Sequence, residues 1–322
     1  MYKFVKKIIP NWIKNIVSLY KERLFLKEIC DLKIMESGVS DDFLPWVRLE
    51  SGLTFYGGRS TQRQKYLYKH VKKQLPNLIE DAMSVVWEIV DRYSVPRSLP
   101  GETVCNPVQT RELRDPLNDF LLNAKERQKV AKIFKLNIGD ICVDVGAFHG
   151  YGTMRLADIV GDTGAVVAIE TDPEALIILK ENIRVNNYTN ILIVNKAASD
   201  HKGKDSFYRI GHTASSLNEQ VLSDVCQEDA AIIEVETSTV DCILQELGIQ
   251  RCNHVSITVN GAEPEVLMGM QETLSASLNV RITIAGWYYR EGRRIAEIVN
   301  PVLKKMGFNV ITGKLGRVLA WK

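Results

Sequence analysis

Apolar side chains recur every three to four residues over positions 3–27, which is the spacing of one face of a helix. Pro10 fits the first turn of a second helix or a kink. The prolines between residues 95 and 107 predict a loop. We therefore expect residues 1–115 to form a mainly helical N-terminal extension.

From about residue 116 the pattern changes to short apolar runs that alternate with helical stretches. The runs predict strands at 141–146, 165–170, 191–194, 231–235, 254–259 and 281–285, with helices at 125–136, 151–160 and 173–186. The last two runs, 308–312 and 317–321, flank a glycine turn and predict a hairpin.

Alternation of strand and helix predicts βαβ units, and hence an α/β domain over residues 116–322 with a Rossmann-like, mostly parallel sheet. The terminal hairpin adds antiparallel strands. In such a sheet, ligands bind beyond the carboxyl ends of the strands, where the strand order reverses. The loops after the strands are therefore the place to look for chemistry.

Composition and charge narrow the classes of protein to which the chain could belong. The 322 residues are 45% hydrophobic and 25% charged, which is ordinary globular usage, and the net charge of +2 gives no reason to expect a nucleic-acid partner. Residues 1–28 carry seven basic and two acidic side chains. This segment is either a helix lying on an anionic membrane surface, with Trp12 and Tyr20 near the headgroups, or a helix packed on protein.

The six cysteines include no CxxC pair and have no histidine cluster beside them. We therefore expect reduced thiols, no metal site and a cytoplasmic location, with peripheral membrane contact through residues 3–27 as an option.

Glycines follow the first expected strand of the domain, at 146, 150 and 152 after Asp144. Their spacing is not that of the GxGxxG dinucleotide fingerprint. They permit a tight turn and close approach of a ligand, or they only allow the helix to pack on the strand.

Glu170 ends the second strand, 24 residues beyond Gly146. An acid in this place is suited to accept hydrogen bonds from two ribose hydroxyls. Alternatively it is a solvated acid at a helix start, since Asp172 and Glu174 there also favour the helix dipole. Thr171 and Glu174 have the spacing of a capping box for that helix.

Two further loops carry polar residues. Small residues at 197–199 follow the third strand and would leave room for a flat ring. After the strand at 254–259 come Asn260, Gly261 and Glu263, with Glu263 at a helix start, where it either caps the helix or faces the cleft.

Together these pieces resemble the FkbM family of S-adenosylmethionine-dependent methyltransferases over about residues 116–322. The resemblance is carried by ordered matches: Asp144 to Tyr151, the acid Glu170, Asn195 to Asp200, Thr239 with Asp241, Gly261 to Glu263, and Val266 to Gly269.

The resemblance implies S-adenosyl-L-methionine as cofactor. It places the methionine part against the first glycine loop, the ribose against the second strand end and the adenine against the third loop. The implied cofactor residues are Asp144, Gly146, Ala147, Gly150, Tyr151, Glu170, Thr171, Ala197 and Asn260.

One stretch departs from the family pattern of Lys-x-Asp-x-Glu-Gly-x-Glu, because Ser256, Thr258 and Asn260 replace its first three polar positions. Methyl transfer to a hydroxyl gains from a general base. The candidates are Glu263 and His149, with His212 as a further histidine, and each has an alternative structural role.

The function that this resemblance implies is methylation of a hydroxyl on a sugar, a lipid-linked glycan or a secondary metabolite. The altered acidic positions leave a second reading, a binding module that has lost catalysis. A third interpretation is an NAD-dependent oxidoreductase. The glycine spacing and the terminal hairpin disfavour it.

Overall fold

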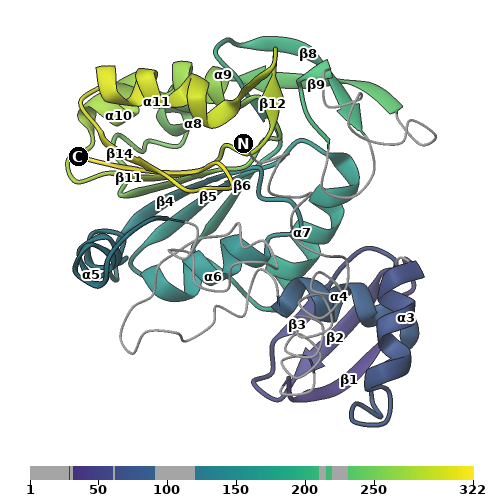
Figure 1. Ribbon diagram of the computed structural model, residues 1–322. Helices are drawn as coiled ribbons and strands as arrows, with labels where there is room; N and C mark the ends of the chain where they lie inside the picture. Colours follow the sequence, from purple (N-terminus) through teal and green to yellow (C-terminus); the bar gives the residue numbers. More distant parts are fainter. Residues whose placement is uncertain (1–28, 30–31, 61, 91–119, 210–214, 220–230) are drawn as a thin grey trace. The chain divides into compact units, whose positions relative to one another are not determined.

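The computed structural model describes residues 29, 32–60, 62–90, 120–209, 215–219 and 231–322 (Figure 1). The chain divides into two compact units, Met1–Val90 and Asp91–Lys322. The amphipathic segment at 3–27, the loop at 95–107, the expected boundary at 115/116 and His212 lie outside the described residues.

The N-terminal unit contains a three-stranded antiparallel sheet, β1 (Ile34–Val39), β2 (Pro45–Leu49) and β3 (Thr54–Tyr56). Helices α3 (Gln62–Val71) and α4 (Met83–Glu88) follow, the second preceded by a 3-10 turn, η1 (Glu80–Ala82). The expectation of a mainly helical extension missed these three strands. They are short and only partly alternating, so their pattern is weak.

The C-terminal unit is a seven-stranded sheet in the order β14-β15-β11-β10-β4-β5-β6. Its parallel strands are β4 (Ile141–Val145), β5 (Ala165–Ile169), β6 (Ile191–Val194), β10 (His254–Ile257) and β11 (Arg281–Ala285). The chain builds outward from β4 to β6 and then returns to place β10 on the other side of β4. The switch point therefore lies between β4 and β10.

The terminal hairpin is confirmed as β14 (Asn309–Thr312) and β15 (Arg317–Trp321), and β15 runs antiparallel to β11. The fold is thus the expected Rossmann-like α/β architecture, with a mostly parallel sheet and an antiparallel C-terminal hairpin. Among the described residues, no helix combines the length and the apolar content needed to span a bilayer.

Helices cover both faces of the sheet (Figure 1). One face carries α5 (Ala124–Ile133), α6 (Tyr151–Val160) and α7 (Pro173–Val185), and the other carries α8 (Val240–Glu246), α9 (Glu263–Met268), α10 (Gln271–Ala276) and α11 (Ile295–Lys305). Burial on both faces explains why the strands are almost continuously apolar.

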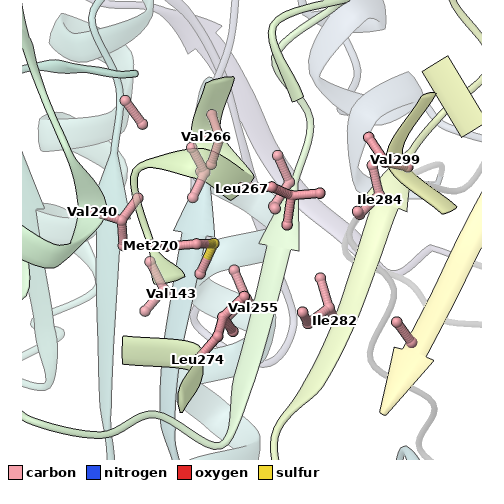
Figure 2. Close-up of a cluster of buried hydrophobic side chains, with 14 of the residues drawn as sticks. Val143, Val240, Val255, Val266, Leu267, Met270, Leu274, Ile282, Ile284 and Val299 are labelled. Atoms are coloured by element: carbon pink, nitrogen blue, oxygen red, sulfur yellow. The ribbon is translucent and has the colours of Figure 1, made fainter. Parts of the chain in front are cut away.

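The main core lies between the sheet and the second group of helices (Figure 2). Val143, Val255 and Ile282 project from three neighbouring strands toward Leu267 and Met270, and all five side chains are fully buried. This core fixes the strands whose ends carry the candidate site.

Two expectations need correction. The strand expected at 231–235 is β9 (Ala231–Ser238), but it does not join the main sheet: it forms a separate sheet with β7 (Ala197–Ala198) and β8 (Gly203–Arg209). Helix α7 is capped by Asp172, whose side chain accepts from the Glu174 N–H, and not by Thr171.

Candidate functional site

Three loops meet at the switch point: residues 146–150 after β4, 170–172 after β5 and 258–262 after β10. Parallel strands end at the same edge of a sheet, so the loops of these three neighbouring strands lie together. Most of the residues that the sequence singled out belong to them.

The loop after β4 depends on its glycines. Gly146 has φ +83°, and a Cβ there would lie 2.0 Å from the Thr258 carbonyl oxygen. Gly150 has φ +81° and precedes α6, and its Cβ would lie 2.4 Å from Leu179 Cδ1. The N–H groups of Gly146 and Ala147 both donate to the Ile169 carbonyl, at 2.9 and 3.1 Å. The turn is therefore pressed against β10 and tied to β5.

Glu170 joins two of the loops through its carboxylate. Its Oε2 accepts from the N–H of Phe148, in the loop after β4, at 2.7 Å. Its Oε1 accepts from the N–H groups of Thr171 and Asp172, both at 2.8 Å, in its own loop. The side chain is 8% exposed. The carboxylate thus fixes the turn after β4 relative to the end of β5.

Burial raises the pKa of Glu170, and the three backbone N–H groups oppose that rise. Each carboxylate oxygen can accept about two hydrogen bonds. Oε1 already accepts two from the backbone and Oε2 accepts one, so one acceptor position remains on Oε2 for a hydroxyl.

Asp144 lies at the end of β4 and is 3% exposed. Its Oδ2 accepts from the Thr153 hydroxyl of α6 at 2.6 Å. Tyr151, the first residue of α6, is 1% exposed and lies in the core. The structure thus brings Asp144 to the edge and places the Tyr151 ring in the interior.

The loop after β10 is held by its own side chains. Glu263 is 0% exposed, and its carboxylate accepts from the N–H groups of Val259 (3.2 Å) and Gly261 (2.8 Å). Burial raises the pKa of Glu263 to about 7. Asn260 adopts φ +54°, and its Nδ2 donates to the Ser215 carbonyl at 2.8 Å.

Thr258 shows a different situation in the same loop. Its Oγ1 is buried and has no hydrogen-bond partner among the described residues. Ser256, two residues earlier on the same side of β10, likewise has a buried hydroxyl without a partner there. A buried hydroxyl that is left unpaired at a ligand-binding edge is a candidate contact for the ligand.

His149 is buried, and its ring stacks on Phe148 with centroids 3.7 Å apart. Its carbonyl accepts from Asn182 of α7 at 2.8 Å. The ring is therefore held by its stack on Phe148, and the backbone of His149 is held by α7.

The third loop lies farther along the edge. Ala197 is 6% exposed in β7, and it packs in a small cluster with Phe207 and Val235. Thr171 stays beside Glu170 and is 9% exposed. The family-like pair Thr239 and Asp241 is used to build the fold, because Thr239 caps α8 and Asp241 accepts from two N–H groups at the start of α10.

Sequence reasoning missed the residues that approach this edge from the second sheet. Arg209 ends β8 and bonds both Asp172 (3.3 Å) and Glu174 (2.8 Å). Ser215 and Ser216 reach the loops after β5 and β10. No periodicity marks single polar residues in a connection of this kind, so the sequence carried no signal for them.

Comparisons with known proteins identify the family of the chain. The model of the FkbM methyltransferase domain matches residues 144–310, more than half of the chain. Two crystal structures illustrate the level of similarity to solved proteins. A methyltransferase FkbM from Methylobacillus flagellatus KT is 14% identical with a TM-score of 0.39, over 57% of this chain and 43% of that one. Aeropyrum pernix fibrillarin, in complex with S-adenosyl-L-methionine, is 12% identical with a TM-score of 0.39, over 90% and 99%.

The chain thus spans less than half the length of the first of these structures. No curated protein matches it. The family assignment therefore depends on the family model. The family model places the chain in the class of S-adenosylmethionine-dependent methyltransferases, and the sheet with its loops fits that class. Within that class, the chain belongs to the FkbM family, and S-adenosylmethionine is its cofactor.

The residues at the edge fit this cofactor. Asp144 and Glu170 are buried carboxylates, which suit ribose hydroxyls as donors and a sulfonium or ammonium group as a cation. The unpaired Thr258 Oγ1 and the remaining acceptor position on Glu170 Oε2 provide contacts that the protein itself does not use.

Proposed function

We propose that this protein transfers the methyl group of S-adenosylmethionine to a hydroxyl on a sugar, a lipid-linked glycan or a secondary metabolite. The observation that carries the proposal is Glu170, which lies at the switch point of a chain matched by the FkbM family model and holds the loop after β4 while keeping one acceptor position open.

When bound, the cofactor supplies an electrophilic methyl group. The protein's part is to hold and orient, and this can account for most of the acceleration of such a transfer. Glu170 would accept from a ribose hydroxyl, Asp144 would lie near the cationic end, and the glycine turn at 146–150 would let the ligand approach the backbone. Ala147, Thr171, Ala197 and Asn260 remain proposed contacts in the loops around them.

The proton of the acceptor hydroxyl needs a base. Glu263 is our candidate, because its pKa of about 7 suits proton transfer near neutral pH. Its oxygens accept from two N–H groups of its own loop, so it would have to exchange one of these bonds for the substrate. His149 is the second candidate, and its ring would have to leave its stack on Phe148.

A second function has specific support. Asn260 and Thr258 replace acids of the family pattern, and the Asn260 amide is used to bind the Ser215 carbonyl. A protein built in this way could bind the cofactor without catalysing transfer, so we retain a methyltransferase-like binding module as the alternative.

Radiolabelled methyl transfer separates the two functions. The full chain is incubated with methyl-labelled S-adenosylmethionine and either a glycolipid extract or a polar metabolite extract. We expect label in a product that survives alkaline hydrolysis, because a methyl ether on a hydroxyl is stable where a methyl ester releases methanol. Glu263→Gln should lower the rate by about 10²–10⁴-fold if Glu263 is the base. Tight cofactor binding with no transfer into either extract would favour the module.

We also propose that residues 3–27 bring the protein to an anionic membrane, which would suit a lipid-linked acceptor. The full chain should sediment with vesicles that contain phosphatidylglycerol, and the quadruple change of Lys3, Lys6, Lys7 and Lys14 to Glu should abolish this. Failure of the unaltered chain to sediment would refute membrane contact.

A further inference from the structure

Ser215 bonds two loops that belong to different strands. Its carbonyl accepts from Asn260 Nδ2 at 2.8 Å, in the loop after β10, and its hydroxyl donates to Asp172 Oδ2 at 3.4 Å, after β5. These two strands flank β4 on either side, so their ends are about 10 Å apart. One residue therefore spans the edge at which the glycine turn lies.

The residues that follow Ser215 strengthen the attachment on the β10 side. The Ser216 hydroxyl donates to the Val259 carbonyl at 3.0 Å and accepts from the Asn218 N–H at 3.0 Å. A Cβ at Gly261 would lie 2.7 Å from Asn218 Nδ2, so this segment packs closely on the loop. Ser216 is 1% exposed, which shows that the contact is a packed one.

The β5 side has its own anchor. Arg209, at the end of β8, pairs with Asp172 at 3.3 Å and with Glu174 at 2.8 Å. Its side chain is 20% exposed. The second sheet is therefore tied to the start of α7 next to Glu170, as Ser215 is.

We propose that residues 215–218 form a strap across the cofactor edge and that Asn260 is the positioning residue that holds it. This inference rests on the proposed function. The strap joins the loop that carries Glu170 to the loop that carries Thr258, so a cofactor held between them is enclosed on its outer side. Its release requires the strap bonds to break, and the strap sets the rate of release.

The residue type at 260 agrees with this role. Asn, Asp and Gly tolerate a positive φ, so backbone geometry alone would permit any of the three at φ +54°. Only the Asn amide can donate to the Ser215 carbonyl, because a carboxylate in the same place has no N–H and would face the carbonyl oxygen with an acceptor oxygen. The family acid at this position would therefore remove the strap bond.

The test compares Asn260→Asp and Asn260→Gly with the unaltered chain. The release of S-adenosylhomocysteine is followed by stopped flow, and amide hydrogen exchange of residues 215–219 is measured without any ligand. We expect release to accelerate about tenfold in both variants, more in Asn260→Asp than in Asn260→Gly, and exchange at 215–219 to rise in both. Asn279→Asp is the matched control, because Asn279 is also at positive φ (+58°) but is exposed on a distant turn.

The outcomes separate the two claims. Unchanged release, or unchanged exchange at residues 215–219, in the Asn260 variants would overturn the strap. Slower release or tighter binding would also overturn it, since the segment would then obstruct the cofactor. If the unaltered chain binds no S-adenosylhomocysteine, the proposed function and the retention role both fail. The exchange measurement would still decide whether Asn260 holds the segment.

Discussion

Glu170 and Glu263 are both buried glutamates that accept hydrogen bonds from backbone N–H groups at the carboxyl edge of the sheet. Glu170 reaches across to Phe148 in a neighbouring loop, whereas the bonds that Glu263 accepts from the described residues come from the loop that precedes its own helix. Glu170 therefore fixes two loops relative to each other, and Glu263 fixes the shape of one loop.

The surroundings of the two glutamates differ in the same sense. The loops around Glu170 match the family pattern, and three backbone N–H groups donate to the Glu170 carboxylate. The loop around Glu263 departs from the pattern, leaves the Thr258 hydroxyl unpaired and uses Asn260 to bind another segment. The loops that carry Glu170 and the glycines therefore keep the polar residues of the family pattern, whereas β10 and the loop after it replace three of them.

The largest effect is expected where the two regions touch, at Gly146. Gly146→Ala puts a Cβ 2.0 Å from the Thr258 carbonyl at a φ that alanine disfavours, so we expect a loss of about 3 kcal/mol or more in unfolding free energy. Urea unfolding measures it. Gly248→Ala is the control, since it has a similar φ (+72°) and open space, and should cost about 1 kcal/mol. Equal losses would show that the loops do not press on each other.

Removing the acid on the cofactor side comes next. Glu170→Ala should weaken binding of S-adenosylhomocysteine by about 1–3 kcal/mol, because it deletes the ribose acceptor and frees the loop after β4. Calorimetry gives the affinity. Asp162→Ala, which removes an exposed carboxylate between α6 and β5, should leave it unchanged. Unaltered affinity in Glu170→Ala would refute the assignment.

The burial of Glu263 should show itself in the pH dependence of stability. The pKa of Glu263 is about 7 in the folded chain against 4.5 ordinarily, so the folded state binds the proton more tightly. The bound proton therefore stabilises the folded state. This contribution to the free energy of unfolding, on the order of 3 kcal/mol, is fully present below about pH 4.5 and is lost as the pH rises through 7. Glu263→Gln should flatten this decline between pH 5 and 8. An identical decline in the variant would contradict the raised pKa of Glu263.

The smallest effect concerns Thr258. Thr258→Val keeps the shape and removes a buried hydroxyl without a partner, so we expect the free protein to gain up to about 1 kcal/mol in unfolding free energy. Binding of S-adenosylhomocysteine should weaken if that hydroxyl contacts the cofactor. A clear loss of stability without ligand would mean that the hydroxyl is already satisfied.

Much of the framework could be predicted from the sequence, because burial on both faces leaves continuous apolar runs. The strands at 141–145, 165–169 and 191–194 and the hairpin at the end of the chain follow directly from such runs. Glu170 and the glycines could be placed at the strand ends for the same reason. β8 could not, because it is largely polar and mostly unburied, and the three strands at 34–56 could not, because they are short and alternate only in part.

The hydrogen bonds within the site could not be predicted from the sequence. Nothing in the pattern shows that Glu170 accepts from Phe148, that Glu263 accepts from its own loop, or that Asn260 bonds to Ser215. These bonds depend on where the backbone of one loop passes the side chain of another. That is decided by packing of the whole unit and not by local periodicity.

The central claim is that the edge formed by the loops after β4, β5 and β10 binds the adenosyl cofactor. A crystal structure of the full chain with S-adenosylhomocysteine tests it most directly. We predict density for the ligand at this edge, with a ribose hydroxyl within hydrogen-bond distance of Glu170. Ligand density at another place, or a Glu170 carboxylate that contacts only backbone N–H groups while the ligand is bound, would contradict it.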